Sequence, residues 1–207
     1  LPNLNSSTGE KEKVAKLQKI YSNLQDAFGR AEAVYGPYDE WCSGIDQATC
    51  YKRGFERITE FMKYSKVCTV SDACTLFDAN GGSEGNRTPH AIILPDGATV
   101  GFHCSTIGGY IYIDLDGPNK GANVHCREYF QLGIRPDDFN KQKYIVTYMS
   151  RWMVKDNEVF NTAYSTQAGH CAAWVLVNGN MDYLKLDSSG KCPDGQQLQF
   201  GVKTSCK

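Results

Sequence analysis

The first part of the chain carries apolar residues at alternating intervals of three and four positions, which is the pattern of an amphipathic helix. Ser7 followed by Glu10 matches a capping box, and Gly36-Pro37 ends the pattern because proline cannot continue the hydrogen-bond ladder. The apolar stripe consists of Val14, Leu17, Tyr21, Leu24, Phe28, Ala31 and Tyr35. The pattern predicts one helix over residues 7–35, which would be roughly 43 Å long at its usual rise per residue.

The remaining pattern predicts a shorter helix and then a series of strands. Residues 53–64 have helical spacing, and the Gly-, Asn- and Ser-rich stretch 69–88 predicts a surface loop. Strands are expected at residues 90–94, 99–104, 109–115 and 129–134, where aromatic and β-branched residues alternate with turn residues. The apolar runs at 144–149 and 171–177 fit either a helix or a strand, and 181–184 and 198–200 fit edge strands or loops.

Helices first and strands afterwards is the order of an α+β fold, not of alternating βαβ units. We therefore predict a long N-terminal α-helix packed on an antiparallel β-sheet, in a single domain over residues 1–207. Within it, 7–35 is the long helix, 36–88 a helix and loop region, and 89–207 the sheet and a C-terminal disulfide region.

Nine cysteines are the strongest compositional signal, and none belongs to a Cys-x-x-Cys pair of the kind that binds zinc. Their spacing suggests short-range disulfides, each contributing about 2–4 kcal/mol by restricting the unfolded chain. The expected pairs are Cys42 with Cys50, Cys68 with Cys74, Cys104 with Cys126, and Cys192 with Cys206, which leaves Cys171 unpaired among apolar neighbours. Disulfides of this kind indicate an oxidising compartment: the periplasm, the cell surface or the extracellular space.

Charge and hydropathy exclude several classes of function. A formal net charge of −1 gives no electrostatic reason to expect binding to nucleic acid or to an anionic membrane. No run approaches the roughly 18 consecutive apolar residues of a membrane span. The chain begins Leu1-Pro2 with no initiator methionine or signal peptide, so we expect that an N-terminal addressing segment has been removed.

The sequence predicts no catalytic residue and no enzyme activity. His-Cys occurs at 103–104, 125–126 and 170–171, but neighbouring side chains on a strand point to opposite faces, and the signatures of catalytic cysteines are absent. We interpret Cys104 and Cys126 as halves of disulfides, and Cys171 as the unpaired cysteine among apolar neighbours. No phosphate-binding loop, dinucleotide fingerprint, nucleophile elbow or metalloprotease motif is present.

Asp114, Asp116 and Asn119 offer hard oxygen ligands that would suit calcium, although the run lacks the rest of an EF-hand loop. A turn whose Asp and Asn side chains bond to their own backbone accounts for the same residues. No other cofactor is expected.

Several segments are similar to parts of one known family. They are residues 27–36 at the helix end, Leu94-Pro95-Asp96-Gly97, residues 113–119, Phe130-Gln131-Leu132, and residues 174–184. Together with the long helix, the sheet and the C-terminal cysteines, they resemble the globular portion of a type IV pilin or type II secretion pseudopilin. The family's prepilin cleavage site and its apolar stretch of about 20 residues are not in this sequence.

The resemblance implies a structural filament subunit that functions in assembly, adhesion or secretion. Its partners would be copies of itself and other pilin-like subunits, on a bacterial surface or in the periplasm, with a precursor anchored in the inner membrane; it names no surface receptor. It also implies that the segment between Cys192 and Cys206 is an exposed contact region. The alternatives are a secreted cysteine-rich binding module, such as an adhesin, and a secreted hydrolase.

Overall fold

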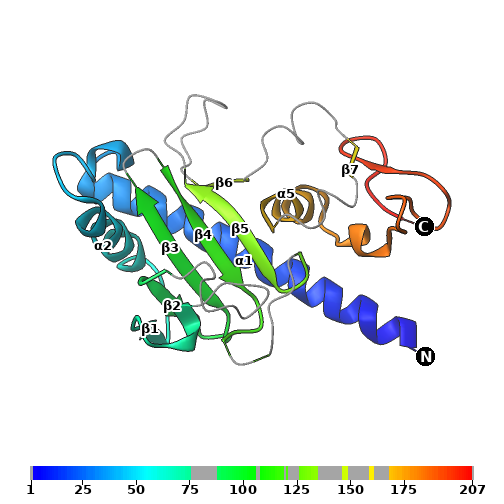
Figure 1. Cartoon of the computed structure of the whole chain (residues 1–207), viewed down its shortest axis with the longest axis horizontal. Helices are drawn as coiled ribbons and strands as arrows, with labels where there is room; N and C mark the ends of the chain where they lie inside the picture. Colours follow the sequence, from blue (N-terminus) through cyan, green and yellow to red (C-terminus); the bar gives the residue numbers. More distant parts are fainter. Residues whose placement is uncertain are drawn as a thin grey trace.

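A long helix crossing one face of an antiparallel sheet dominates the computed structural model (Figure 1). The structure describes residues 2–75, 88–105, 108–118, 120, 126–134, 146–148, 159–160 and 168–206. The helices are α1 (Pro2–Tyr35), α2 (Gln47–Thr59) and α5 (Ala168–Asn178), with short 3-10 turns at Tyr38–Glu40, Ala73–Thr75 and Asp182–Lys185. The strands are β1 (Lys66–Cys68), β2 (Ala91–Ile93), β3 (Thr99–Ser105), β4 (Gly108–Asp114), β5 (Tyr129–Ile134), β6 (Val146–Tyr148), β7 (Val159–Phe160) and β8 (Leu198–Gln199).

The apolar stripe of α1 packs on the sheet as the spacing predicts. The buried residues of the stripe are Val14, Leu17, Leu24, Phe28 and Ala31. Ile20 and Ala27, which lie beside the stripe on the helix, are buried as well. Tyr35, at the end of the stripe, is 37% exposed. The helix begins at Pro2, so the expected start at Ser7 was wrong: the capping-box residues lie inside a continuous helix. Its 34 residues span about 51 Å.

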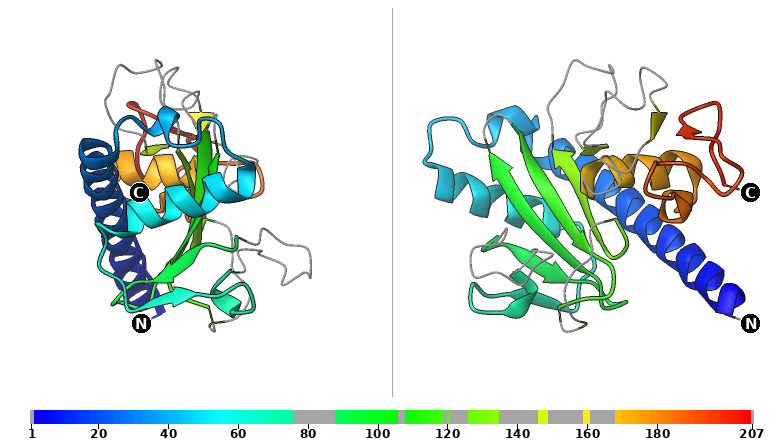
Figure 2. Two further views of the ribbon diagram at one scale, coloured as in Figure 1. Left: turned by 90° about the vertical axis from the view of Figure 1, so that its left-hand side faces the viewer. Right: turned by 45° about the vertical axis from the view of Figure 1, so that its right-hand side comes forward.

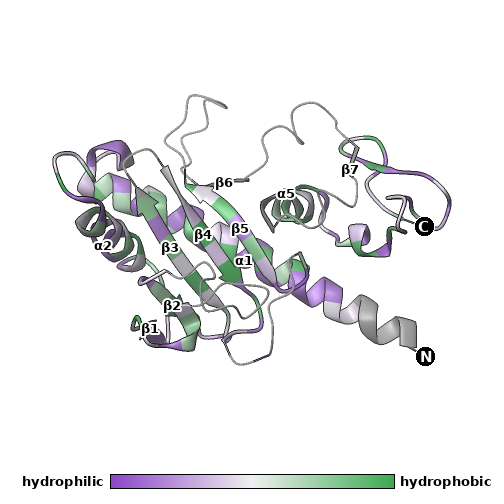
Figure 3. Cartoon of the chain, in the orientation of Figure 1, coloured by the Kyte–Doolittle hydropathy of each residue, from purple (hydrophilic) through white to green (hydrophobic). Residues whose placement is uncertain are grey.

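The N-terminal end of α1 extends past the sheet and away from the rest of the protein, in Figure 1 and in the right-hand view of Figure 2. From Thr8 to Lys13 the helix has no buried side chain, and Val14 is the first buried position among the side chains of α1 that the structure describes. Figure 3 shows this described part of α1 in hydrophilic colours. The stripe therefore holds only the later part of the helix against the sheet.

Six strands form one antiparallel sheet in the order β1-β2-β3-β4-β5-β6, and β7 pairs with β8 separately. The four strands expected between residues 90 and 134 are confirmed as β2 to β5. β1 lies in the region expected to hold only a helix and loops, and it joins the sheet through β2. The run at 144–149 supplies a strand, β6, whereas the run at 171–177 is the helix α5.

The two faces of the sheet differ in what covers them. One face carries the apolar side chains of β3, β4 and β5 and is covered by α1, α2 and α5, seen edge-on in the left-hand view of Figure 2. The opposite face holds a smaller cluster around Tyr112, Tyr129 and the disulfide between Cys68 and Cys74. Because side chains alternate between faces, residues one step apart on a strand belong to different clusters.

The second helix begins six residues before its expected start at Arg53 and ends before the expected limit at Tyr64. Asp46 caps it, because its carboxylate accepts a hydrogen bond of 3.0 Å from the Thr49 backbone N–H. Gly54 lets α2 approach β3 closely: a Cβ at this position would lie 2.7 Å from Cys104 Sγ.

Three of the expected disulfides are confirmed, Cys42–Cys50, Cys68–Cys74 and Cys192–Cys206. The expected pairing of Cys104 with Cys126 was wrong, because Cys126 is bonded to Cys171, 45 residues away. Cys126 lies just before β5, and Cys171 lies on α5, which packs against β5. The unpaired cysteine is Cys104, buried between β3 and α2.

Replacing a residue of the stripe will destabilise the fold. Leu24 is fully buried, so Leu24→Ala should lower the free energy of unfolding by about 2–5 kcal/mol through lost contacts and a residual cavity. The adjacent Asn23 is exposed, and Asn23→Ala should change it by less than about 0.5 kcal/mol. Urea unfolding followed by circular dichroism measures both, and equal losses would contradict the packing described here.

Thiol chemistry will distinguish Cys104 from the other eight cysteines. Burial raises the pKa of its thiol to about 12, so almost none is thiolate at pH 8. Ellman's reagent should find no reactive thiol in the native protein and one thiol after unfolding without reductant. Peptide mapping should place that thiol at Cys104, and its appearance at Cys171 would contradict the disulfide assignment.

Candidate functional site

Lysines beside the apolar stripe attach α1 to the ends of the strands. Lys13 Nζ lies 2.8 Å from Glu128 Oε1, just before β5. Lys16 Nζ donates to the backbone oxygens of Asp96 (3.1 Å) and Leu115 (2.5 Å), in the turn after β2 and after β4. Partly exposed contacts of this kind contribute about 1 kcal/mol or less each. Their effect is to fix where along the helix the sheet ends and the projecting part begins.

The face of α1 that points away from the sheet is exposed and carries small and polar residues. Exposed positions along it include Ala15, Gln18, Lys19, Ser22, Asp26, Gly29, Arg30 and Ala33. Arg30 and Asp26 lie 3.7 Å apart as an i,i+4 pair, which modestly supports the helix itself. The exposed face thus runs from Ala15 to Ala33, alongside the buried face, which runs from Val14 to Ala31.

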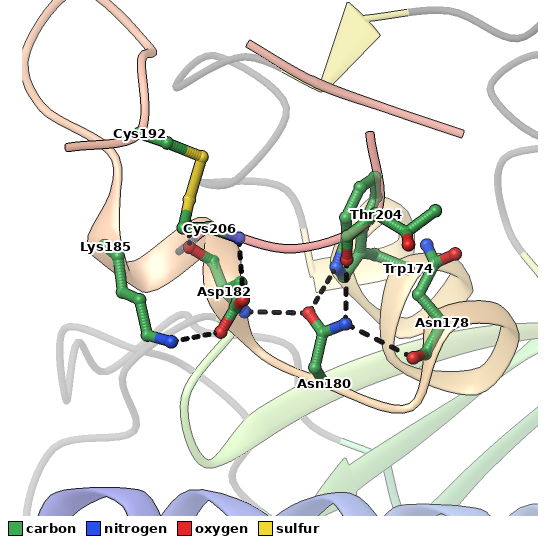
Figure 4. A network of polar contacts seen from close by, with 8 residues as sticks. All are labelled: Trp174, Asn178, Asn180, Asp182, Lys185, Cys192, Thr204 and Cys206. Carbon is green, nitrogen blue, oxygen red and sulfur yellow. Dashed lines mark hydrogen bonds and ion pairs between the residues drawn. A yellow bond between two sulfur atoms is a disulfide. The ribbon is translucent and has the colours of Figure 1, made fainter. Parts of the chain in front are cut away.

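The C-terminal region is anchored by a polar network around Asn180 and Asp182 (Figure 4). The Asn180 side-chain oxygen accepts hydrogen bonds of 3.0 Å from Trp174 Nε1 and from the Asp182 backbone N–H. Its Nδ2 donates to the Thr204 carbonyl at 2.8 Å. One amide therefore connects α5, the 3-10 turn after it and the last residues of the chain.

Asp182 continues this network to the C-terminal disulfide. Its Oδ2 accepts a hydrogen bond of 2.8 Å from the Cys206 backbone N–H, and its Oδ1 pairs with Lys185. Cys206 is bonded to Cys192, so the loop between them is held at both ends (Figure 4). Residues 181–184 were expected to be an edge strand or loop. Met181 precedes the 3-10 turn Asp182–Lys185, and the Asp182 carboxylate of that turn bonds to the Cys206 backbone.

The segment closed by Cys192 and Cys206 presents a fixed, exposed tip. Lys203 pairs with Asp194 across it, and Val202 is 71% exposed. Beneath it, the Trp174 and Phe200 rings pack edge to face with centroids 4.8 Å apart. The resemblance implies that this segment is an exposed contact region; its exposure is confirmed, and the disulfide and the hydrogen bonds of Thr204 and Cys206 connect it to the residues around Asn180 and Asp182.

Two of the three expected calcium ligands lie at the end of β4 and in the turn after it, Asp114 and Asp116. Asp114 is buried, and its Oδ1 accepts hydrogen bonds from the backbone N–H groups of Asp116 (3.2 Å) and Gly117 (3.1 Å). This is the aspartate turn that the sequence favours as the alternative to calcium. Gly117 has a φ of +88°, and a Cβ there would lie 2.4 Å from the Gly97 carbonyl oxygen. Asn119 lies outside the described residues.

Burial raises the pKa of Asp114 to about 7, and the neighbouring Asp116 carboxyl raises it further. The hydrogen bonds from the two backbone N–H groups act in the opposite direction and lower this pKa. Because this pKa lies above the ordinary value, loss of the proton destabilises the native state as the pH rises through about 7. Within the described part of the chain, no three His, Cys, Asp or Glu side chains gather in a group that could hold a metal.

The His-Cys pairs show no nucleophile with its base where the structure describes them. His103 points to the face of β3 opposite Cys104, and its ring centroid lies 4.4 Å from that of Tyr51 and 6.3 Å from that of Tyr110. Burial lowers the pKa of His103, which favours its neutral form. Cys126 and Cys171 are bonded to each other. His125 and the side chain of His170 lie outside the described residues.

Comparison with known proteins finds no relative: no protein-family model, no curated protein and no solved structure matches this chain. Among the helices that the structure describes, none is both long and apolar enough to cross a membrane.

Removing the Asn180 amide will loosen the C-terminal segment without unfolding the core. Asn180→Ala leaves Trp174 Nε1 and the Thr204 carbonyl without their partner, at a cost of about 1–3 kcal/mol for each polar group that remains buried. Amide hydrogen exchange measured by mass spectrometry should accelerate across residues 180–206 and stay unchanged in α1.

The matched control is Asp194→Asn, which alters an exposed pair inside the same loop and should leave exchange at residues 180–190 as it is. Equal acceleration in both variants, or none in Asn180→Ala, would show that the network does not anchor this region.

Proposed function

We propose that this chain is the globular part of a structural subunit of a type IV pilus or type II secretion pseudopilus, and that it functions by assembly without catalysis. The observation that carries the proposal is the projection of α1 beyond the sheet. A helix that only covered a core would gain little from the six residues between Thr8 and Lys13, none of which has a buried side chain. A projecting helix suits a subunit that continues into the centre of a filament.

The proposal divides α1 into two functional parts. The stripe from Val14 to Ala31 attaches the helix to the sheet, and the segment near Pro2 points away along the same axis. In the proposed subunit, an apolar continuation of this helix would anchor the precursor in the inner membrane and would later pack against its neighbours. The partners are then copies of this chain and other pilin-like subunits.

The outer surface of such a filament would be formed by the parts of the subunit remote from α1. In the proposed subunit, the loop closed by Cys192 and Cys206 provides a contact surface there, because its tip is exposed and its base is anchored by Asp182. Four disulfides indicate an oxidising compartment, which agrees with a periplasmic or extracellular location.

The second candidate function is a secreted cysteine-rich binding module. The disulfides and the exposed C-terminal loop favour it as strongly as they favour a filament. Only the projecting helix separates the two candidates, because a monomeric module needs no continuation of α1.

The test uses the full natural gene and a bulky substitution on the exposed face of α1. Upstream of Leu1 the gene should encode a prepilin cleavage site and an apolar segment of about 20 residues. Ala15→Trp should keep the monomer folded and strongly reduce the amount of this protein in filaments sheared from cells, because Ala15 is exposed on the helix that would face a neighbour.

The control is Ser188→Trp, which adds the same side chain at an exposed position far along the chain from α1 and should leave filament incorporation unchanged. A conventional cleavable signal peptide upstream of Leu1, or full incorporation of Ala15→Trp, would refute the filament proposal.

A further inference from the structure

A row of aromatic rings crosses the face of the sheet opposite α1, which is the face turned toward the reader in Figure 1. Tyr110 and Tyr112 project to this face from β4, because side chains two positions apart on a strand share a face. His103 of β3 is directly opposite Tyr110 in the register, and the Tyr51 ring of α2 packs on the His103 ring. The aromatic row thus draws on three elements and consists of Tyr51, His103, Tyr110 and Tyr112.

Neighbouring rings of the aromatic row lie close to each other along its whole length. The ring centroids of Tyr51 and His103 are 4.4 Å apart, those of His103 and Tyr110 are 6.3 Å apart, and those of Tyr110 and Tyr112 are 6.4 Å apart. The Tyr112 ring in turn lies nearly parallel to that of Tyr129 on β5, with centroids 6.2 Å apart, and both of these side chains are buried. This buried pair fixes one end of the row against the sheet.

Two glycines lie beside the tyrosines of the aromatic row. Tyr110 is directly opposite Gly133 of β5, and Tyr112 is directly opposite Gly101 of β3. A glycine inside a strand has no side chain to pack, and it often marks a place where a ligand approaches the backbone closely. Tyr110 is 38% exposed, so part of this aromatic surface is open to solvent. The sheet therefore presents an exposed ring that has no side chain directly opposite it on β5.

The polar groups of the aromatic row are neutral, and two of them lack hydrogen-bond partners. Among the residues that the structure describes, the ring nitrogens of His103 and the hydroxyl of Tyr110 form no hydrogen bond. Burial lowers the pKa of His103 and so favours its neutral imidazole. Gln131, opposite Tyr112 on β5, adds an amide to the same face. A ligand that carries several hydroxyl groups can both donate to and accept from groups of these kinds.

The aromatic row contains no carboxylate, lysine or arginine, which narrows the class of ligand. On the same face, Lys66 of β1 is paired with Asp72, and Asp114 is buried in its own turn. An anionic ligand would need an unpaired cation, and a quaternary ammonium ion is bound by aromatic rings that form a cage around it. Rings that follow one another across a sheet, with neutral polar groups at their edges, suit a neutral sugar. Its C–H groups can stack on a ring while its hydroxyl groups bond at the ring edge.

We propose that the aromatic row is a binding surface for a neutral oligosaccharide, with Tyr110 as the principal stacking ring and His103 as a hydrogen-bond partner of the sugar hydroxyls. Tyr51 and His103 are half-buried and Tyr110 is exposed, so a sugar would bury little of its own surface. The dissociation constant should therefore be on the order of 1 mM.

The aromatic row and α1 lie on opposite sides of the sheet, as the left-hand view of Figure 2 shows for the sheet and the helix. Sugar binding and an assembly that uses α1 would thus occupy different surfaces. The inference does not rest on the filament proposal, because a filament subunit and a secreted binding module would use the same surface. For the second of these candidate functions it supplies the class of ligand.

Saturation-transfer NMR on the folded wild-type chain tests this surface directly. The probes are neutral hexasaccharides of cellulose, chitin, amylose and mannan, with a heparin hexasaccharide and choline as charged probes. Irradiation of the aromatic protons of the protein should transfer saturation to the C–H protons of at least one neutral hexasaccharide. Tyr110→Ala should weaken that binding by at least about tenfold, and Tyr110→Phe, which keeps the ring, should weaken it less. Titration of the transfer gives the dissociation constants.

The matched control is Tyr64→Ala, which removes another exposed tyrosine, outside the aromatic row and two residues before β1. It should leave sugar binding unchanged, and circular dichroism should show that every variant is folded. The proposal would be overturned by no transfer to any neutral hexasaccharide, by transfer to the heparin fragment or choline alone, or by equal losses in Tyr64→Ala and Tyr110→Ala. None of these results bears on the filament proposal, because the experiment uses the isolated chain.

Discussion

The packing of α1 against the sheet is the interaction on which the remaining structure depends. Five large side chains of its stripe, Val14, Leu17, Ile20, Leu24 and Phe28, are buried. At about 1.5–3 kcal/mol for each, their burial contributes on the order of 10 kcal/mol, comparable with the whole net stability of an ordinary domain. The lysine contacts at the ends of the strands add far less, but they fix the position of the sheet along the helix. The stripe thus determines both that the domain folds and how much of α1 remains outside it.

The disulfides secure the parts of the chain that the stripe does not reach. Cys126–Cys171 joins α5 to the sheet beside β5, and Cys192–Cys206 closes the C-terminal segment, whose base is fixed by Asn180 and Asp182. These connections convert a C-terminal region with few strands of its own into a defined surface. A surface segment of this kind has too little apolar area to be stabilised by a core of its own. Disulfides and a short polar network can instead keep it in one conformation.

The sequence predicts those features whose cause is local. The stripe of α1, the strands at 99–105 and 129–134, and three short-range disulfides follow from spacing alone. The features it mispredicts depend on tertiary neighbours. Cys126 bonds to Cys171 because α5 packs on β5, which leaves Cys104 as a thiol, buried where α2 approaches β3 at Gly54. The network of Asn180 and the contact of the Tyr51 and His103 rings likewise join residues that no periodicity connects.

The central claim is that α1 is one continuous rod whose first part lies outside the domain, and a distance along it tests this most directly. Nitroxide labels at Lys11→Cys and Ala33→Cys occupy exposed positions of α1, and the buried Cys104 will not compete for labelling. Because the two positions are 22 residues apart in the sequence, pulsed electron resonance should give one narrow distribution of distances centred at about 33 Å. A broad distribution, or one centred well below that distance, would mean that the helix breaks and folds back onto the domain, and would contradict this account.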